Sequence, residues 1–181
     1  SRGLGDVYKR QPWDSGKIAE QRFTAWQEGM TGYPLVDAGI RQLLAEGWMH
    51  NRVRMVVGSF LVKHLHIQWQ RGAEFFLQHL VDGDTASNQL GWQWVAGSGT
   101  DAAPYVRIFN PILQAHRFDP EGDYVRKYVP ELRQISGGAV HEPWLLEDSV
   151  APEYPARIVD LSAERNEALR RLSLIHISEP T

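Results

Sequence analysis

The chain has no cysteine among its 181 residues. This absence excludes disulfide bonds and thiolate metal sites, and it fits a protein of the reducing cytoplasm. The sequence also lacks any apolar run of about 18 residues, the length of a membrane helix, so no membrane partner is expected. The remaining balance, 43% hydrophobic and 23% charged residues, is typical of a globular domain with one buried core.

No useful stretch alternates between polar and apolar residues, as half-buried strands do. Apolar residues recur instead at helical spacing, as at Val36, Ile40 and Leu43, with Gly47 placed to end that helix. We therefore predict an all-α fold with an extended segment at 105–111. The predicted helices cover residues 18–26, 36–44, 49–69, 73–80, 120–128 (capped by Asp119) and 162–172.

The two ends differ in character from the rest of the chain. Residues 1–11 show no clear periodicity, and residues 173–181 follow a charged helical stretch without a stop signal. We interpret both as non-native flanks around a genuine segment at 12–172. Charge is also uneven: residues 41–71 hold five basic residues against one acid, whereas residues 141–181 hold eight acids against four arginines. A locally basic face of this kind is compatible with phosphate contacts.

Polar side chains interrupt the apolar 49–69 helix near its start. On a helix, Asn51 and Met55 share one face, with Arg52 beside them. A helix that serves only the core does not need this combination. It suits a cavity that holds a flat aromatic group with a polar edge against a nucleic acid.

Arg54 points about 100° away from Met55 on the same helix. If it is buried it needs an acid, and Asp82 or Asp84 in the following turn is the natural partner. A purely structural ion pair is the alternative. Seven tryptophans are many for this length. Two of them, Trp92 and Trp94, are one residue apart, so one indole can face the core while the other lines a cavity.

Linked motifs in order along the chain point to a family. They are TGYP at 31–34 with Asp37, GWMHNR at 47–52, DGD at 82–84, WQW at 92–94, GTDAAPY at 99–105, RIFNP at 107–111 and VHEPW at 140–144. From about residue 13 to residue 144 the chain resembles the C-terminal part of the helical FAD-binding domain of the photolyase/cryptochrome family. The likeness is greatest to class I cyclobutane pyrimidine dimer photolyases.

The resemblance implies FAD as cofactor and a role for each matching residue. Flavin-binding residues would be Arg54, Asp82, Gly83, Asp84 and Asn88, with Asn88 against flavin N5. Electron carriers to the photoexcited flavin would be Trp92, Trp69 and Trp13. The cavity for a flipped-out thymine dimer and its phosphates would be lined by Asn51, Arg52, Met55, Trp94, Arg107 and Gln114.

The implied activity is light-driven repair of cyclobutane pyrimidine dimers in DNA, by electron transfer from reduced, photoexcited FAD in a monomeric carbon–carbon lyase. Such dimers stack poorly, which lowers the cost of flipping them out of the duplex; photolyases are a standard example of base flipping. The family's antenna domain and the first half of its flavin domain have no counterpart here. An antenna chromophore of folate or deazaflavin type would therefore bind outside this chain, and the chain alone is predicted to bind flavin poorly and not to repair DNA.

Three other interpretations stay open. A cryptochrome-type blue-light photoreceptor shares the fold and cofactor but signals instead of repairing. A non-enzymatic helical nucleic-acid-binding domain explains the basic helix but leaves Asp82, Asp84 and Asn88 without a role. A metal site at His64 and His66 is disfavoured, because histidines two residues apart point to different sides of a helix. The other histidines singled out, His50, His116 and His141, are interpreted as surface or structural residues.

Overall fold

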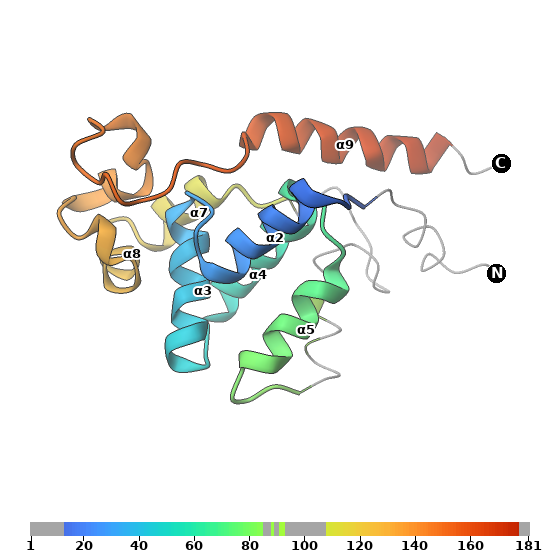
Figure 1. The fold of residues 1–181 in the computed structure, drawn as a ribbon, viewed down its shortest axis with the longest axis horizontal. Helices are drawn as coiled ribbons and strands as arrows, with labels where there is room; N and C mark the ends of the chain where they lie inside the picture. Colours follow the sequence, from blue (N-terminus) through green and yellow to red (C-terminus); the bar gives the residue numbers. More distant parts are fainter. Residues whose placement is uncertain (1–12, 85–87, 89–90, 93–107, 178–181) are drawn as a thin grey trace.

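The computed structural model describes residues 13–84, 88, 91–92 and 108–177. These residues form helices and connecting turns with no strand among them, which confirms the predicted all-α fold. In Figure 1 the helix α3 stands beside α2, α4 and α7, with α8 and α5 on opposite sides and α9 running along the top. The α-helices are α2 (Lys17–Glu28), α3 (Pro34–Glu46), α4 (Asn51–Ser59), α5 (Trp69–His79), α7 (Pro111–Phe118), α8 (Asp123–Tyr128) and α9 (Leu161–Ile177). Shorter helical turns are η1 (Phe60–His64), η3 (Pro130–Leu132), η4 (Gly137–His141) and η5 (Pro143–Leu145).

The first two helices form where the sequence predicts them. Helix α2 ends at Gly29 and α3 ends at Gly47, and both glycines adopt the left-handed conformation that stops a helix. Pro34 opens α3, at a position where no backbone N–H is needed for the helix. The predicted C-cap at Gly47 is therefore confirmed.

A buried carboxylate fastens the start of α3. Asp37 accepts hydrogen bonds from the Thr31 backbone N–H at 2.8 Å, the Thr31 hydroxyl at 2.6 Å and the Gly32 N–H at 3.1 Å. The Tyr154 hydroxyl donates to Oδ2, the oxygen that also accepts from Gly32, whereas both Thr31 groups donate to Oδ1. Complete burial raises the pKa of Asp37, while the hydrogen bonds from Thr31 and Tyr154 oppose that rise. This one side chain holds the 29–34 turn and the loop around Tyr154 against α3.

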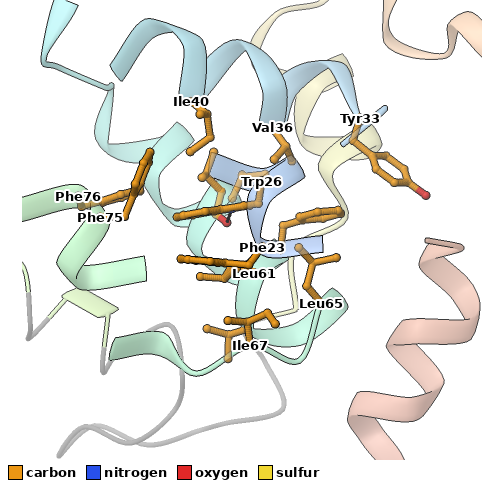
Figure 2. Packing of buried hydrophobic residues seen from close by; sticks show 14 of the residues in the cluster. Phe23, Trp26, Tyr33, Val36, Ile40, Leu61, Leu65, Ile67, Phe75 and Phe76 are labelled. Carbon is orange, nitrogen blue, oxygen red and sulfur yellow. Dashed lines mark hydrogen bonds between the residues drawn. The ribbon is translucent and has the colours of Figure 1, made fainter. Parts of the chain in front are cut away.

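Trp26 connects three helices at the centre of the core (Figure 2). Its ring stacks on Phe23 at 5.8 Å and on Phe76 at 5.9 Å between centroids, and it meets Trp92 edge-on at 6.1 Å. Its Nε1 donates to the Val57 carbonyl at 3.1 Å, so the buried indole N–H is satisfied. Helices α2, α4 and α5 are thereby packed around one side chain.

The single helix predicted over 49–69 is wrong in its second half. Helix α4 ends at Ser59 and is followed directly by the π-helical turn η1. In this turn the Leu65 N–H donates to the Phe60 carbonyl at 3.0 Å. Trp69 then starts α5, although it was predicted to end the preceding helix. The predicted helix at 73–80 accordingly begins earlier than expected.

Contacts from distant segments explain this break. His66 has a positive φ of 55°, which is unusual for a residue other than glycine. Its carbonyl accepts from the Asp14 N–H at 2.9 Å, and its Nε2 lies 2.6 Å from the Glu164 carboxylate. Asp14 also receives a hydrogen bond from Arg171 of α9 at 2.9 Å. The strained turn is therefore fixed by tertiary contacts that local periodicity does not report.

Helix α7 was not predicted, because its segment followed residues interpreted as extended. Asn110 caps it by accepting hydrogen bonds from the N–H groups of Ile112 and Leu113, and Pro111 occupies its first turn. Helix α8 begins at Asp123, later than predicted. The N-cap of α8 is Gly122, so the predicted cap at Asp119 is wrong in position, although the Asp119 carboxylate accepts from the N–H groups of Tyr124 and Val125 in the first turn.

Helix α9 covers the predicted 162–172 helix and packs against η1. In this way it closes the core over the strained turn at His66. Of the helices in the described ranges, none has the length and apolar character needed to cross a membrane. The predicted domain limits at residues 12 and 172 stay predictions, and the structure does not describe residues 1–12 or 178–181.

Candidate functional site

A cavity of about 390 Å³ opens between α4, α5 and the turn that follows α5. Its volume lies in the range of small-molecule sites. One part of its wall is apolar and another carries amide, guanidinium and carboxylate groups. Eight of the residues predicted from the sequence line it: Asn51, Arg54, Met55, Asp82, Gly83, Asp84, Asn88 and Trp92.

Helix α4 contributes Asn51, with Arg54 three residues and Met55 four residues after it, both at helical spacing from Asn51. His50 caps this helix, its Nδ1 accepting from the Arg52 N–H at 3.2 Å. The Arg54 Nε donates to the Met49 carbonyl at 2.6 Å, which fixes the root of its guanidinium beside the cavity. The Asn51 amide lies 4.0 Å from the Met55 sulfur, so an amide and a soft apolar group are offered side by side.

The turn after α5 brings carboxylates to the opposite edge. Asp82 Oδ1 lies 3.8 Å from the Arg54 guanidinium, as the sequence predicts for one of the two candidate acids. The side chain of Asp82 is 59% exposed and that of Arg54 is 27% exposed, so water screens this pair. Both groups consequently remain accessible to a polar ligand in the cavity.

Asn88 is held in place from two sides. Its N–H donates to the Asp84 carbonyl at 2.9 Å, and its amide Nδ2 donates to the Ala73 carbonyl of α5 at 2.7 Å. The amide is therefore oriented before any ligand binds, which is the property expected of a group that must meet one atom of a cofactor ring.

Trp92 closes the inner end of the cavity with only 4% of its surface exposed. Its ring lies 4.8 Å from Phe76 and 6.1 Å from Trp26 between centroids, edge-on to both. Trp92 thus joins the cavity to the aromatic core, as an inward-facing indole should.

The other predicted residues are more scattered. Trp69 packs against the main core, and Trp13 borders a small void of about 20 Å³ beside His66 and Arg171. Arg52 lies over the Phe118 ring at 4.7 Å, outside the cavity lining.

Gln114 lines a separate cavity of about 360 Å³ next to α9 instead of the first one. Trp94 and Arg107 fall outside the described residues. The functional roles of all these side chains remain predictions.

Four lining residues were not singled out from the sequence: Gly58, Phe76, Leu80 and Gly91. Phe76 and Leu80 are four residues apart at the end of α5, so the apolar periodicity of that helix could have identified both. Gly58 gave no signal, because a glycine in an apolar helix is informative only when its neighbour in space is known.

The cavity suits a flat, polar-edged ring system. Trp92, Phe76 and Leu80 offer an apolar wall, while Asn88 and the Arg54–Asp82 pair offer a donor and charged groups at the edge. A flavin ring fits this donor set. In the described part of the chain, His64 and His66 included, no group of three potential metal ligands occurs.

Comparison with known proteins identifies the family. A family model described as the FAD binding domain of DNA photolyase matches residues 1–174. The chain belongs to this family. The prediction made from the motifs is thereby confirmed, and the cofactor named by the family agrees with the character of the cavity.

Named relatives and solved structures agree with this membership. The chain is 57% identical over 143 residues to a deoxyribodipyrimidine photo-lyase of Streptomyces griseus, covering 78% of this chain and 31% of that protein. It is 51% identical over 162 residues to the one of Escherichia coli, covering 88% and 34%.

Among solved structures, a class III photolyase of Agrobacterium tumefaciens matches with a TM-score of 0.89 and 46% identity, over 98% of this chain and 38% of that one. A Synechocystis cryptochrome matches with a TM-score of 0.82 and 37% identity, over 92% and 36%. The chain thus spans about a third of the length of its photolyase relatives.

Proposed function

We propose that this chain is the cavity-forming part of an enzyme that uses blue light to split cyclobutane pyrimidine dimers in DNA. One observation carries the proposal. Eight residues predicted from separate motifs, on α4, in the 82–84 turn and at 88 and 92, line one cavity of about 390 Å³. The relatives named deoxyribodipyrimidine photo-lyase support the same activity.

The chain's own residues would bind and orient FAD, which supplies the light-driven one-electron chemistry when bound. Arg54 and Asp82 would hold the polar edge of the ring system, and the fixed Asn88 amide would face its central nitrogen. Trp92 and Phe76 would exclude water from the inner end. These side chains are packed or hydrogen-bonded in the structure, which favours precise placement.

Trp92 would act as the first electron donor when the flavin is oxidised. It would give one electron to the photoexcited ring. The oxidised Trp92 would then be reduced by Trp69, and the oxidised Trp69 by Trp13. A thiol reductant in solution would return the missing electron to Trp13. Contact of Trp92 with both the cavity and the core supports this role.

DNA would approach from the side of Asn51 and Arg52. Asn51 and Met55 offer an amide and an apolar contact for a flipped-out thymine dimer, and Arg52 suits a phosphate. The proposed partner is DNA that contains pyrimidine dimers, and the enzyme is proposed to act on it as a cytoplasmic monomer.

A chimera tests the proposal, because the chain covers only a third of its relatives. Residues 13–172 would replace the matching third of the Escherichia coli relative, to which the chain is 51% identical. We expect the chimera to bind FAD and to remove thymine dimers from an oligonucleotide under blue light only. A chimera that folds but stays colourless when FAD is added would refute the proposal.

Because the chain is also similar to a cryptochrome, the same experiment can distinguish DNA repair from light sensing. A flavin-loaded chimera that is reduced by light but leaves dimers intact, while the unmodified relative repairs them, would favour a light-sensing role. Dark and illuminated samples of both proteins provide the comparison.

A further inference from the structure

The indole of Trp92 enters a notch formed by two glycines on neighbouring helices. Gly58 belongs to α4 and Gly72 belongs to α5. A Cβ built on Gly58 would lie 3.4 Å from Trp92 Cζ3 and 3.5 Å from Trp92 Cη2. The same benzo edge of the ring therefore touches both helices.

The two glycines differ sharply in the space they leave. A Cβ built on Gly72 would overlap Trp92 Cη2 and lie 2.7 Å from Trp92 Cζ3. It would also lie 2.6 Å from Leu61 Cδ2. At Gly58 a methyl group would make ordinary van der Waals contact, whereas at Gly72 atoms must move.

Backbone conformation does not explain either glycine. Neither has a positive φ, so any residue could adopt the backbone found there. Glycine inside a helix is also less favourable than alanine, by about 1 kcal/mol. The remaining reason for glycine at position 72 is the room it gives to the indole and to the Leu61 side chain.

We propose that Gly72 is a positioning residue for Trp92, which it holds at the wall of the flavin cavity. The inference rests on the proposed function, in which Trp92 donates an electron to the flavin. Gly72 itself does not line the cavity, so it would act only through the ring. The Leu61 side chain can change rotamer, but the rigid indole can respond to a methyl group only by moving as a whole. Phe76 and Trp26 lie against the same ring, so Trp92 has little room to move except toward the cavity.

A double-mutant cycle on the flavin-free chain tests the contact itself. Gly72→Ala is compared in the parent and in the Trp92→Phe background, where the smaller ring lacks the clashing atoms. We expect Gly72→Ala to change the unfolding equilibrium constant about tenfold less when Trp92 is replaced, since residues in contact are coupled. The Gly58→Ala variant should show no such coupling. Equal effects of Gly72→Ala in both backgrounds would overturn the proposal.

The consequence for the flavin is tested in the chimera with FAD bound. Gly72→Ala is expected to change the rate of flavin photoreduction by a thiol reductant at least severalfold and to raise the dissociation constant for FAD, because the displaced Trp92 indole lines the cavity. Gln70→Ala, an exposed substitution on the same helix, is the matched control. Photoreduction as fast as in the control would overturn the positioning role.

The two measurements separate the two hypotheses. Coupling between positions 72 and 92 in a chimera that never binds FAD would refute the proposed function and leave the structural contact intact. Flavin binding and repair without coupling would refute the role of Gly72 alone.

Discussion

Arg54 on α4 and Asp82 in the turn after α5 face each other across the cavity edge, with 3.8 Å between the guanidinium and Oδ1. The Arg54 Nε is anchored separately to the Met49 carbonyl at 2.6 Å. The arginine therefore keeps its place without the acid, and the acid remains largely exposed. A pair arranged in this way contributes little to folding but presents both charges to a ligand.

The first prediction concerns Asp82→Asn. It should change the free energy of unfolding by less than about 1 kcal/mol, because the pair is solvent-screened. In the chimera it should weaken FAD binding about tenfold or more, because hydrogen bonds to a charged group contribute about 1.5–3 kcal/mol. Urea unfolding and a fluorescence titration with FAD measure the two effects.

Asp123→Asn is the matched control for that experiment. Asp123 pairs with Arg126 at 2.9 Å, is 86% exposed and lies on α8, outside the cavity lining. Its replacement should leave FAD affinity unchanged. If both variants bind FAD as the parent does, Asp82 has no part in the site.

The sequence was sufficient for the parts of the fold that local signals determine. The apolar spacing and the glycine at position 47 predicted α3 and its end. The cavity position of Asn51, Arg54 and Asp82 could be predicted because these are polar groups that a core does not need, and their roles in binding stay predictions.

The features that the sequence did not predict depend on contacts between distant segments of the chain. Residues 60–68 are apolar enough to continue a helix, and only Asp14 and Glu164 show why the chain turns at His66. The role of Gly72 was likewise hidden, because Trp92 lies twenty residues further along the chain. Local periodicity contains neither relationship.

A second prediction concerns the buried carboxylate of Asp37. Asp37→Asn would place an amide N–H where donors from Thr31, Gly32 or Tyr154 already point. A buried group left without its partner costs about 1–3 kcal/mol, and several donors are affected here. We expect a loss of about 3 kcal/mol in urea unfolding.

The milder variant Tyr154→Phe removes only one donor, so a loss of about 1 kcal/mol is expected. If Asp37→Asn proves no more harmful than Tyr154→Phe, the carboxylate does not organise this turn.

A third prediction concerns pH. Burial of His64, with a smaller effect from His66, lowers its pKa from 6.5 to about 4. Between about pH 4 and pH 6.5, His64 is therefore protonated in the unfolded chain but neutral in the folded chain. The free energy of unfolding is therefore not reduced by His64 above about pH 6.5. It decreases as the pH falls below that value and levels off near pH 4, after a total loss of about 3 kcal/mol.

The variant His64→Gln should flatten this part of the pH dependence in urea unfolding. Because His64 also stacks on Phe60 at 5.4 Å, the comparison must use the slope with pH and not the stability at one pH. His50→Asn, an exposed change that replaces the capping Nδ1 with an amide oxygen, should preserve the slope. An unchanged slope in His64→Gln would show that other groups cause the pH dependence.

The last prediction concerns Arg52 and the DNA backbone. Arg52 lies 4.7 Å over the Phe118 ring, is exposed, and forms no ion pair with an acid among the described residues. A cation held in place by an aromatic ring and left unneutralised is suited to a phosphate. Each phosphate contact releases counterions, so Arg52→Gln should reduce the slope of log affinity against log salt by about 1 in the chimera. Arg170→Gln removes an exposed arginine already bound to Glu167 at 2.6 Å, and it should leave the slope unchanged. If both variants keep the parent's slope, Arg52 does not contact the backbone, and DNA must approach the cavity from another side.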